Sequence, residues 1–164
     1  MRILRIVMLL MAGLVLTSCA SSKFRTYNGP QVTSVQVWKT QRTLALMHGS
    51  QTLEVYPFEL GFAPNGHKYF EGDGKTPEGV YRIDRRNPNS QYHLSVGISY
   101  PDPEDVARAL EAGLDPGGDI FIHGTPDMFV GRRDWTAGCI AVSNEAIEEI
   151  YAMVQDGTPI VIYP

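Results

Sequence analysis

Residues 120–144 limit the possible folds and functions of this chain more than any other stretch. They carry a thiol and an imidazole that can act together only if the fold brings them into contact. Cys139 follows Gly138, and His123 follows the apolar run 120–122. A thiol needs a base to become a nucleophile at neutral pH, and imidazole has a pKa suited to that work. The stretch therefore makes Cys139 and His123 the candidates for nucleophile and base of one catalytic site.

The glycine before the cysteine supports a nucleophilic role. Glycine lets the backbone turn tightly, so the N–H groups around Ala137, Gly138 and Cys139 can point at a developing oxyanion. His123 is then the general base, which takes the thiol proton and later returns a proton to the leaving amine. The alternatives are a buried structural cysteine and a histidine satisfied in the core at a strand end.

The letters around these residues resemble the L,D-transpeptidase (YkuD-type) catalytic domain of bacterial cell-wall enzymes. The family signature places a histidine in Ile-His-Gly, which matches residues 122–124, and a later Ser/Thr-His-Gly-Cys, which matches residues 136–139. Ala137 departs from the usual second histidine of the signature, and Ala141 from the usual arginine. The resemblance includes GDGKTPEGVYRI, HLSVGISYPDPED and EEIYAMVQDGTPIVIYP, covers residues 32–164, and is similar to the branch with a DWTxGCIAV motif.

The resemblance implies a mostly β fold with short helices, an L,D-transpeptidase-like β-sandwich. It also implies that the carbonyl of Gly124 orients His123. Cys139 would attack the amide between an L-centred diamino acid and D-alanine in a peptidoglycan stem peptide, giving a thioester that passes to an amine or to water. The alternatives are an amidase or endopeptidase, an L,D-carboxypeptidase, and a cell-wall-binding lipoprotein that has lost turnover, which the alanines at 137 and 141 favour.

Five residues are candidates for substrate binding. Arg132 and Arg133 could bind carboxylates and replace the arginine missing at Ala141, or they could form a solvated basic loop. The others are His93, which alternation along residues 92–100 places on a polar face, and two neighbours of the nucleophile, Trp135 and Thr136. Two carboxylates, Asp127 and Asp134, are expected to be loop residues rather than partners of His123.

The N-terminus predicts export and lipidation. Arg2 and Arg5 precede an apolar stretch too short to span a bilayer comfortably, and Leu-Thr-Ser-Cys at residues 16–19 resembles a lipobox. The expected organisation is a signal peptide at 1–18, a lipidated tether at 19–31 and a catalytic domain at 32–164. Multiple acyl chains on Cys19 would attach the protein to a membrane, and Ala20 after it resembles outer-membrane sorting, which predicts the periplasmic face of that membrane. An ordinary secretory signal with an incidental cysteine is the alternative.

Charge and cysteine count exclude other classes. The chain has 14 basic and 18 acidic residues, so removing Arg2 and Arg5 leaves 14 − 2 = 12 basic residues and a net charge of about −6. An acidic chain does not favour nucleic acid as a partner. After lipidation of Cys19 no pair of cysteines remains for a disulfide, and the scattered histidines lack the ligand spacing of a metal site. No metal and no cofactor are expected.

Alternation of apolar residues and turn signals predict the elements. Strands are expected at 35–38, 42–47, 51–60, 80–84, 92–100 and 158–163. Asp102 is expected to cap a short helix that ends near Gly113, and Ser143 a second helix. The expected buried stripes are Val106, Ala109 and Leu110 in the first helix, and Ile147, Ile150, Tyr151 and Val154 in the second.

Overall fold

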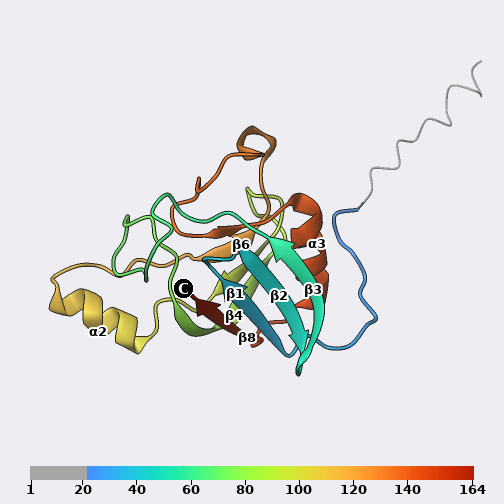
Figure 1. The fold of residues 1–164 in the computed structure, drawn as a ribbon, viewed down its shortest axis with the longest axis horizontal. Helices are drawn as coiled ribbons and strands as arrows, with labels where there is room; N and C mark the ends of the chain where they lie inside the picture. The colour runs from blue at the N-terminus through green and yellow to red at the C-terminus, as the bar shows by residue number, and fades with distance from the viewer. Residues whose placement is uncertain (1–21) are drawn as a thin grey trace, which may run out of the picture.

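The structure is a computed structural model that describes residues 22–164. The predicted signal peptide and Cys19 lie outside these residues. The described chain forms eight strands, two α-helices and one 3-10 helix, shown in Figure 1. The strands are β1 (Ser34–Trp38), β2 (Thr43–His48), β3 (Gln51–Pro57), β4 (Gly79–Asn87), β5 (Ser95–Ile98), β6 (Phe121–His123), β7 (Ile140–Ala141) and β8 (Pro159–Tyr163). The helices are α2 (Pro103–Glu111), α3 (Asn144–Met153) and the 3-10 helix η1 (Asp127–Phe129).

All eight strands belong to one mixed sheet in the order β3-β2-β1-β8-β4-β5-β6-β7. The pairs β1–β8 and β6–β7 are parallel, and the others are antiparallel. Strand β4 joins the two halves, because its first residues pair with β8 and its last residues pair with β5. The register shifts between Ile83 and Arg85. An irregularity of this kind bends a strand, so the long β4 lets the sheet curl.

The two ends of the curled sheet meet after β3. The backbone N–H of Glu59 donates to the carbonyl of Ala141 at 2.8 Å, and the N–H of Ala141 donates back at 2.9 Å. Leu60 and Phe62 make similar bonds to Thr136. The sheet thereby closes around one apolar core, as expected for the mostly β, sandwich-like fold with short helices. Its largest fully buried side chains are Leu44, Leu46, Leu60, Ile83, Leu94, Ile98, Ile122, Ile140, Ile147, Ile150, Ile160 and Ile162.

Strand β5 differs from the strand predicted at 92–100. It is only four residues long, and all four are buried. His93 has φ of +72°, outside the extended region, so the strand begins after it. Helix α3 packs against β5 and β6, which explains why the expected alternation between a buried and a polar face is absent.

Both helices begin where the sequence predicts. Asp102 caps α2 by accepting hydrogen bonds from the N–H groups of Glu104 and Asp105. The predicted stripe of α2 is wrong at Leu110, which is 65% exposed, because α2 projects from one end of the molecule (Figure 1). Of the other predicted residues, Ala109 is buried and Val106 is half-buried. Asp105 is buried as well, and its carboxylate accepts from the hydroxyl of Tyr81 at 2.9 Å.

Helix α3 has the predicted cap and core face. The Ser143 hydroxyl accepts a hydrogen bond from the N–H of Ala146. Ile147, Ile150 and Val154 are fully buried, and Tyr151 is half-buried against the core. The described part of the predicted tether, residues 22–31, runs beside this helix (Figure 1). Within residues 22–164 no helix has the length and apolar character needed to cross a bilayer.

Candidate active site

His123 is the last residue of β6 and is buried, with only 3% of its surface exposed. Its Nδ1 lies 2.7 Å from the carbonyl oxygen of Gly124. A carbonyl can only accept, so Nδ1 carries the proton and Nε2 is left able to take another. Burial lowers the pKa of the imidazole, and the bond to Gly124 opposes this effect in part. The ring is therefore neutral at pH 7, as a general base must be.

Cys139 lies immediately before β7 and is partly exposed. Its Sγ is 3.5 Å from the carbonyl oxygen of Asp119, to which the thiol donates. Burial raises the pKa of the thiol, and a hydrogen bond from the N–H of Phe121 works in the opposite direction. At neutral pH the resting thiol is protonated, so attack requires a base to remove its proton.

One cavity of about 380 Å³ brings the thiol and the imidazole together. Its other walls come mainly from the loop between β4 and β5 and from the chain before β6. The lining residues are Asn87, Asn89, Ser90, Gln91, Tyr92, Ser95, Asp119, Phe121, His123 and Cys139. Amide and hydroxyl groups predominate, and such groups can both donate to and accept from a peptide backbone.

Aromatic rings hold the imidazole in place. Tyr92 stacks on His123 with ring centroids 4.4 Å apart, and the Trp135 ring lies edge-on to His123 at 5.6 Å. Trp135 is itself stacked on Phe129 of η1, at 4.2 Å and nearly parallel. The loop between base and nucleophile is thus tied to the imidazole by packing, and this packing contributes to the burial that lowers its pKa.

Backbone geometry before the nucleophile requires glycine. Gly138 has φ of +134°, and a Cβ there would lie 2.6 Å from the carbonyl oxygen of Lys75. The Gly138 N–H, a predicted oxyanion donor, is bonded to the Thr136 hydroxyl at 3.2 Å, while Ala137 is exposed beside it. The Thr136 hydroxyl also donates to the Cys139 carbonyl at 2.7 Å. Thr136 is buried, lines neither of the two cavities described here, and its hydroxyl contacts lie within the loop.

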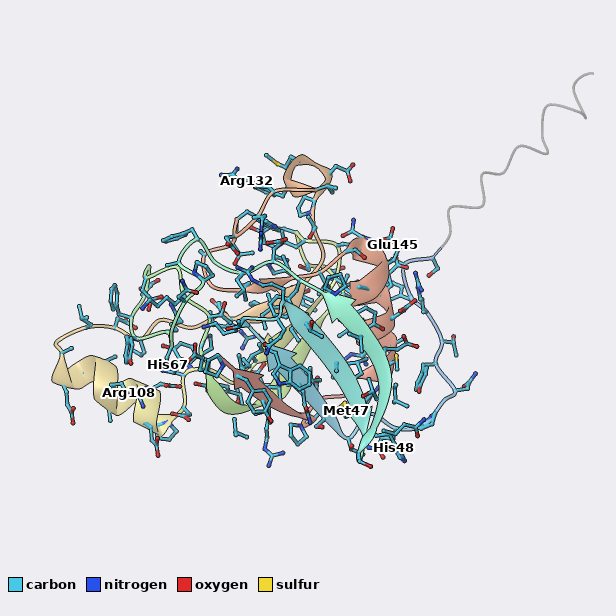
Figure 2. The ribbon with its side chains drawn as sticks, viewed as in Figure 1. Met47, His48, His67, Arg108, Arg132 and Glu145 are labelled. Atoms are coloured by element: carbon cyan, nitrogen blue, oxygen red, sulfur yellow. The ribbon has the colours of Figure 1, made fainter. Side chains whose placement is uncertain are left out.

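A second cavity, of about 510 Å³, is lined by Trp135, whose ring also lies against His123. Arg132 lines it together with Ala141, the position where the family signature has arginine. Figure 2 shows Arg132 on the protruding loop and Glu145 at the start of α3, at the same end of the molecule. Asp127 and Trp135 also line this cavity, whereas Arg133 lines a different one together with Arg42.

Two more of the predicted residues, His93 and Asp134, do not line either cavity. The Nε2 of His93 is 2.8 Å from the carboxylate of Glu148, on α3. Asp134 pairs with Arg42 at 2.5 Å, which lowers the pKa of the Asp134 carboxyl group. Within the described residues no group of three or more histidine, cysteine or acidic side chains could hold a metal ion.

Sequence reasoning missed the loop that walls the thiol cavity. Tyr92 was expected to be a strand residue, yet it stacks on the imidazole and its carbonyl accepts from the N–H of Gly124 at 3.0 Å. The available signal was the stretch Asn-Pro-Asn-Ser-Gln at 87–91, because asparagine, proline and serine are typical turn residues. Nothing in the sequence pointed to Asp119, whose carbonyl reaches the thiol only through the fold.

Fold and site together define a class: a mostly β domain in which one thiol and one buried imidazole face a common cavity of about 380 Å³. The family model described as the L,D-transpeptidase catalytic domain (YkuD) matches residues 33–162. The chain belongs to this family.

Relatives and solved structures agree with this assignment. The chain is 31% identical to the putative L,D-transpeptidase YafK of Escherichia coli strain K12 over 143 residues. This aligned region covers 79% of this chain and 53% of YafK. Two structures at 29% identity are the helical cell shape determining protein Pgp2 of Campylobacter jejuni (K307A mutant; TM-score 0.65, 83% of this chain and 48% of that chain) and Bd1075 of Bdellovibrio bacteriovorus (TM-score 0.59, 81% and 48%). The chain thus spans about half the length of these proteins. An L,D-transpeptidase of Xylanimonas cellulosilytica shares the fold at 17% identity, with a TM-score of 0.55.

Proposed function

We propose that this chain is a cysteine acyl-transfer enzyme that acts on peptidoglycan stem peptides. The observation that carries the proposal is the common cavity of Cys139 and His123, with the imidazole oriented by a 2.7 Å bond to the Gly124 carbonyl. Family membership supplies the substrate class. The resting thiol bonds to Asp119 rather than to the imidazole, and catalytic hydrogen bonds often tighten only when substrate arrives.

The first half-reaction forms a thioester. The Nε2 of His123 takes the proton of the Cys139 thiol, and Sγ attacks the carbonyl carbon of the amide. The resulting oxyanion is stabilised by backbone N–H groups around the nucleophile, of which those of Ala137 and Cys139 flank the engaged N–H of Gly138. When the intermediate collapses, the C–N bond breaks and the imidazolium returns its proton to the leaving amine.

The second half-reaction releases the acyl group. An amine acceptor that loses a proton to His123 attacks the carbonyl carbon of the thioester. The C–S bond then breaks, and the Cys139 thiolate takes the proton back from the imidazolium, which completes transpeptidation. Water in place of the amine completes hydrolysis. Arg132 is positioned to bind a carboxylate of the substrate in the second cavity, where it takes over from the arginine replaced by Ala141. Pgp2 is described as determining helical cell shape, and we extend the proposal to cell-wall remodelling that affects cell shape.

Defined muropeptides test the proposal directly. The purified protein is incubated with tetrapeptide-stem muropeptides, and the products are identified by mass spectrometry. A cross-linked dimer establishes transpeptidation, a stem shortened by D-alanine establishes carboxypeptidation, and Cys139→Ala must abolish either product. Unchanged substrate under all conditions would favour a binding protein without turnover.

A second test needs no natural acceptor. Family resemblance implies that carbapenems acylate the same cysteine, so intact-mass measurement should show an adduct on the wild type and none on Cys139→Ala. If the wild type forms neither this adduct nor any muropeptide product, the alanine at 137 has cost the site its function.

A further inference from the structure

The segment after the predicted lipidation site contacts the active-site loop. The ammonium group of Lys23 donates to the carbonyl of Pro88 at 2.7 Å and to the carbonyl of His93 at 3.0 Å. These two carbonyls stand at the two ends of residues 88–93, which we call the cavity loop. One side chain, more than sixty positions earlier in the chain, therefore joins both ends of this loop.

The cavity loop forms one wall of the thiol cavity. Asn89, Ser90, Gln91 and Tyr92 all line the cavity with Cys139 and His123. Tyr92 also stacks on the imidazole, and its carbonyl accepts from the N–H of Gly124, the residue that orients His123. A displacement of the cavity loop would thus change both the substrate wall and the packing around the base.

Neighbouring residues of the same segment fix Lys23 in position. Arg25 pairs with Glu148 of α3 at 2.9 Å, and Glu148 in turn contacts the Nε2 of His93 at 2.8 Å. The ring of Phe24 lies against Tyr151 with centroids 6.2 Å apart. The segment is tied to α3 through Phe24 and Arg25, the two residues that follow Lys23, and Glu148 of α3 in turn contacts His93 at the C-terminal end of the cavity loop.

We propose that Lys23 is a positioning residue for the acyl-transfer reaction, holding the cavity loop closed against the site. The proposal rests on the proposed function for its kinetic readout. The loop backbone turns sharply at His93, where φ is +72°, so no strand ladder continues into it, and the ammonium supplies the donors for its two end carbonyls. A charged donor makes these among the stronger hydrogen bonds available to a loop.

Lys23→Met removes the donors and retains the length of the side chain. We expect KM for muropeptide to rise and kcat/KM to fall about tenfold, equivalent to about 1.4 kcal/mol, with a smaller change in kcat. Lys23→Arg retains charge and donors and should recover much of the loss. Tyr27→Phe is the matched control, because its hydroxyl bonds to Pro30 in the same segment and not to the cavity loop.

Hydrogen–deuterium exchange supplies a readout that is independent of turnover. Amides of the cavity loop should exchange faster in Lys23→Met than in the wild type or Tyr27→Phe, while β1 and β8 remain unchanged. Intact mass is checked first, so that all variants are compared with the same N-terminal processing. Wild-type kinetics together with wild-type exchange in residues 88–93 would overturn the proposal.

The failure of the proposed function looks different. If even the wild type turns over no muropeptide, Lys23→Met can still be compared with its controls by two measurements. These are hydrogen–deuterium exchange in the cavity loop and the rate at which iodoacetamide alkylates Cys139. Faster loop exchange with an altered alkylation rate supports the positioning role, and no change in either contradicts it.

Discussion

Replacing Gly124 with alanine should disturb the site through its backbone. A Cβ at this position would lie 2.8 Å from the carbonyl oxygen of Tyr92 and 3.1 Å from the Cβ of His93, and it would also meet the side chain of Asn144. Real Cβ atoms do not approach backbone oxygens so closely, and the Tyr92 carbonyl is itself bonded to the Gly124 N–H. The cavity loop, Gly124 or both must therefore move.

The cost follows from this overpacking. Inserting a methyl group into a tightly packed site costs about 1–3 kcal/mol of unfolding free energy. For a domain of this size that corresponds to a fall in melting temperature of roughly 3–10 °C. Because the Gly124 carbonyl holds Nδ1 of His123, the imidazole shifts as well, and a displacement near 1 Å costs up to ~10²-fold in rate.

Thermal unfolding by circular dichroism and kcat/KM on a muropeptide measure the two effects. Gly118→Ala is the matched control, since the atoms nearest to a Cβ there are 3.9 Å away and Gly118 does not have a positive φ. The control should keep its melting temperature, or rise slightly because alanine restricts the unfolded chain. If Gly124→Ala melts and turns over like the wild type, the close approach of Tyr92 to Gly124 does not control the site.

The remaining predictions concern the chemistry and the anchor. Cys139→Ala and His123→Ala should each remove most of the turnover, and the double variant should lose little more than either; a double variant that loses the product of the two effects would show that they do not act as a unit. Because burial lowers the pKa of His123, the base stays neutral as the pH falls below about 6.5, so the acid limb of kcat/KM should lie below that value. The thiol pKa is raised, so alkylation of Cys139 by iodoacetamide should be slow near pH 6 and accelerate only in alkaline solution; rapid alkylation at pH 5–6 would reveal a thiolate–imidazolium pair instead. Cys19→Ala should release the protein from the membrane fraction or leave its precursor uncleaved, and wild-type protein without lipid by mass spectrometry would contradict the anchor.

The sequence predicted helices and turns correctly where a few neighbouring residues determine the local structure. Asp102 and Ser143 were expected to cap helices, and they do, because capping depends on residues only a few positions apart. The hairpin around Gly49 formed for the same reason. Leu110 was expected to be buried and is exposed, since helical periodicity shows which residues share a face but not whether anything covers that face.

Some residues of the candidate site could likewise be predicted from local sequence, and others could not. His123, Cys139 and the glycines beside them could be singled out from the sequence, because their residue types and neighbours already limit the chemistry. The sequence could not tell which of Arg132 and Arg133 lies at the site. In the structure Arg132 lines the second cavity, whereas Arg133 lines a different cavity together with Arg42. Adjacent residues in an irregular loop have no fixed periodicity, so only the path of the loop decides which side chain reaches a cavity.

The sequence by itself determined a mostly β domain with short helices and a thiol–imidazole pair, since strand periodicity, helix caps and residue chemistry act over short distances. Tertiary structure alone decided that Tyr92 covers the imidazole, that the Asp119 carbonyl accepts a hydrogen bond from the thiol, and that Lys23 joins both ends of the cavity loop. Each of these contacts links segments from different parts of the chain through a backbone carbonyl or a ring face. Every residue has a carbonyl, so the sequence carries no mark of which one will be used until the curled sheet has brought the segments together.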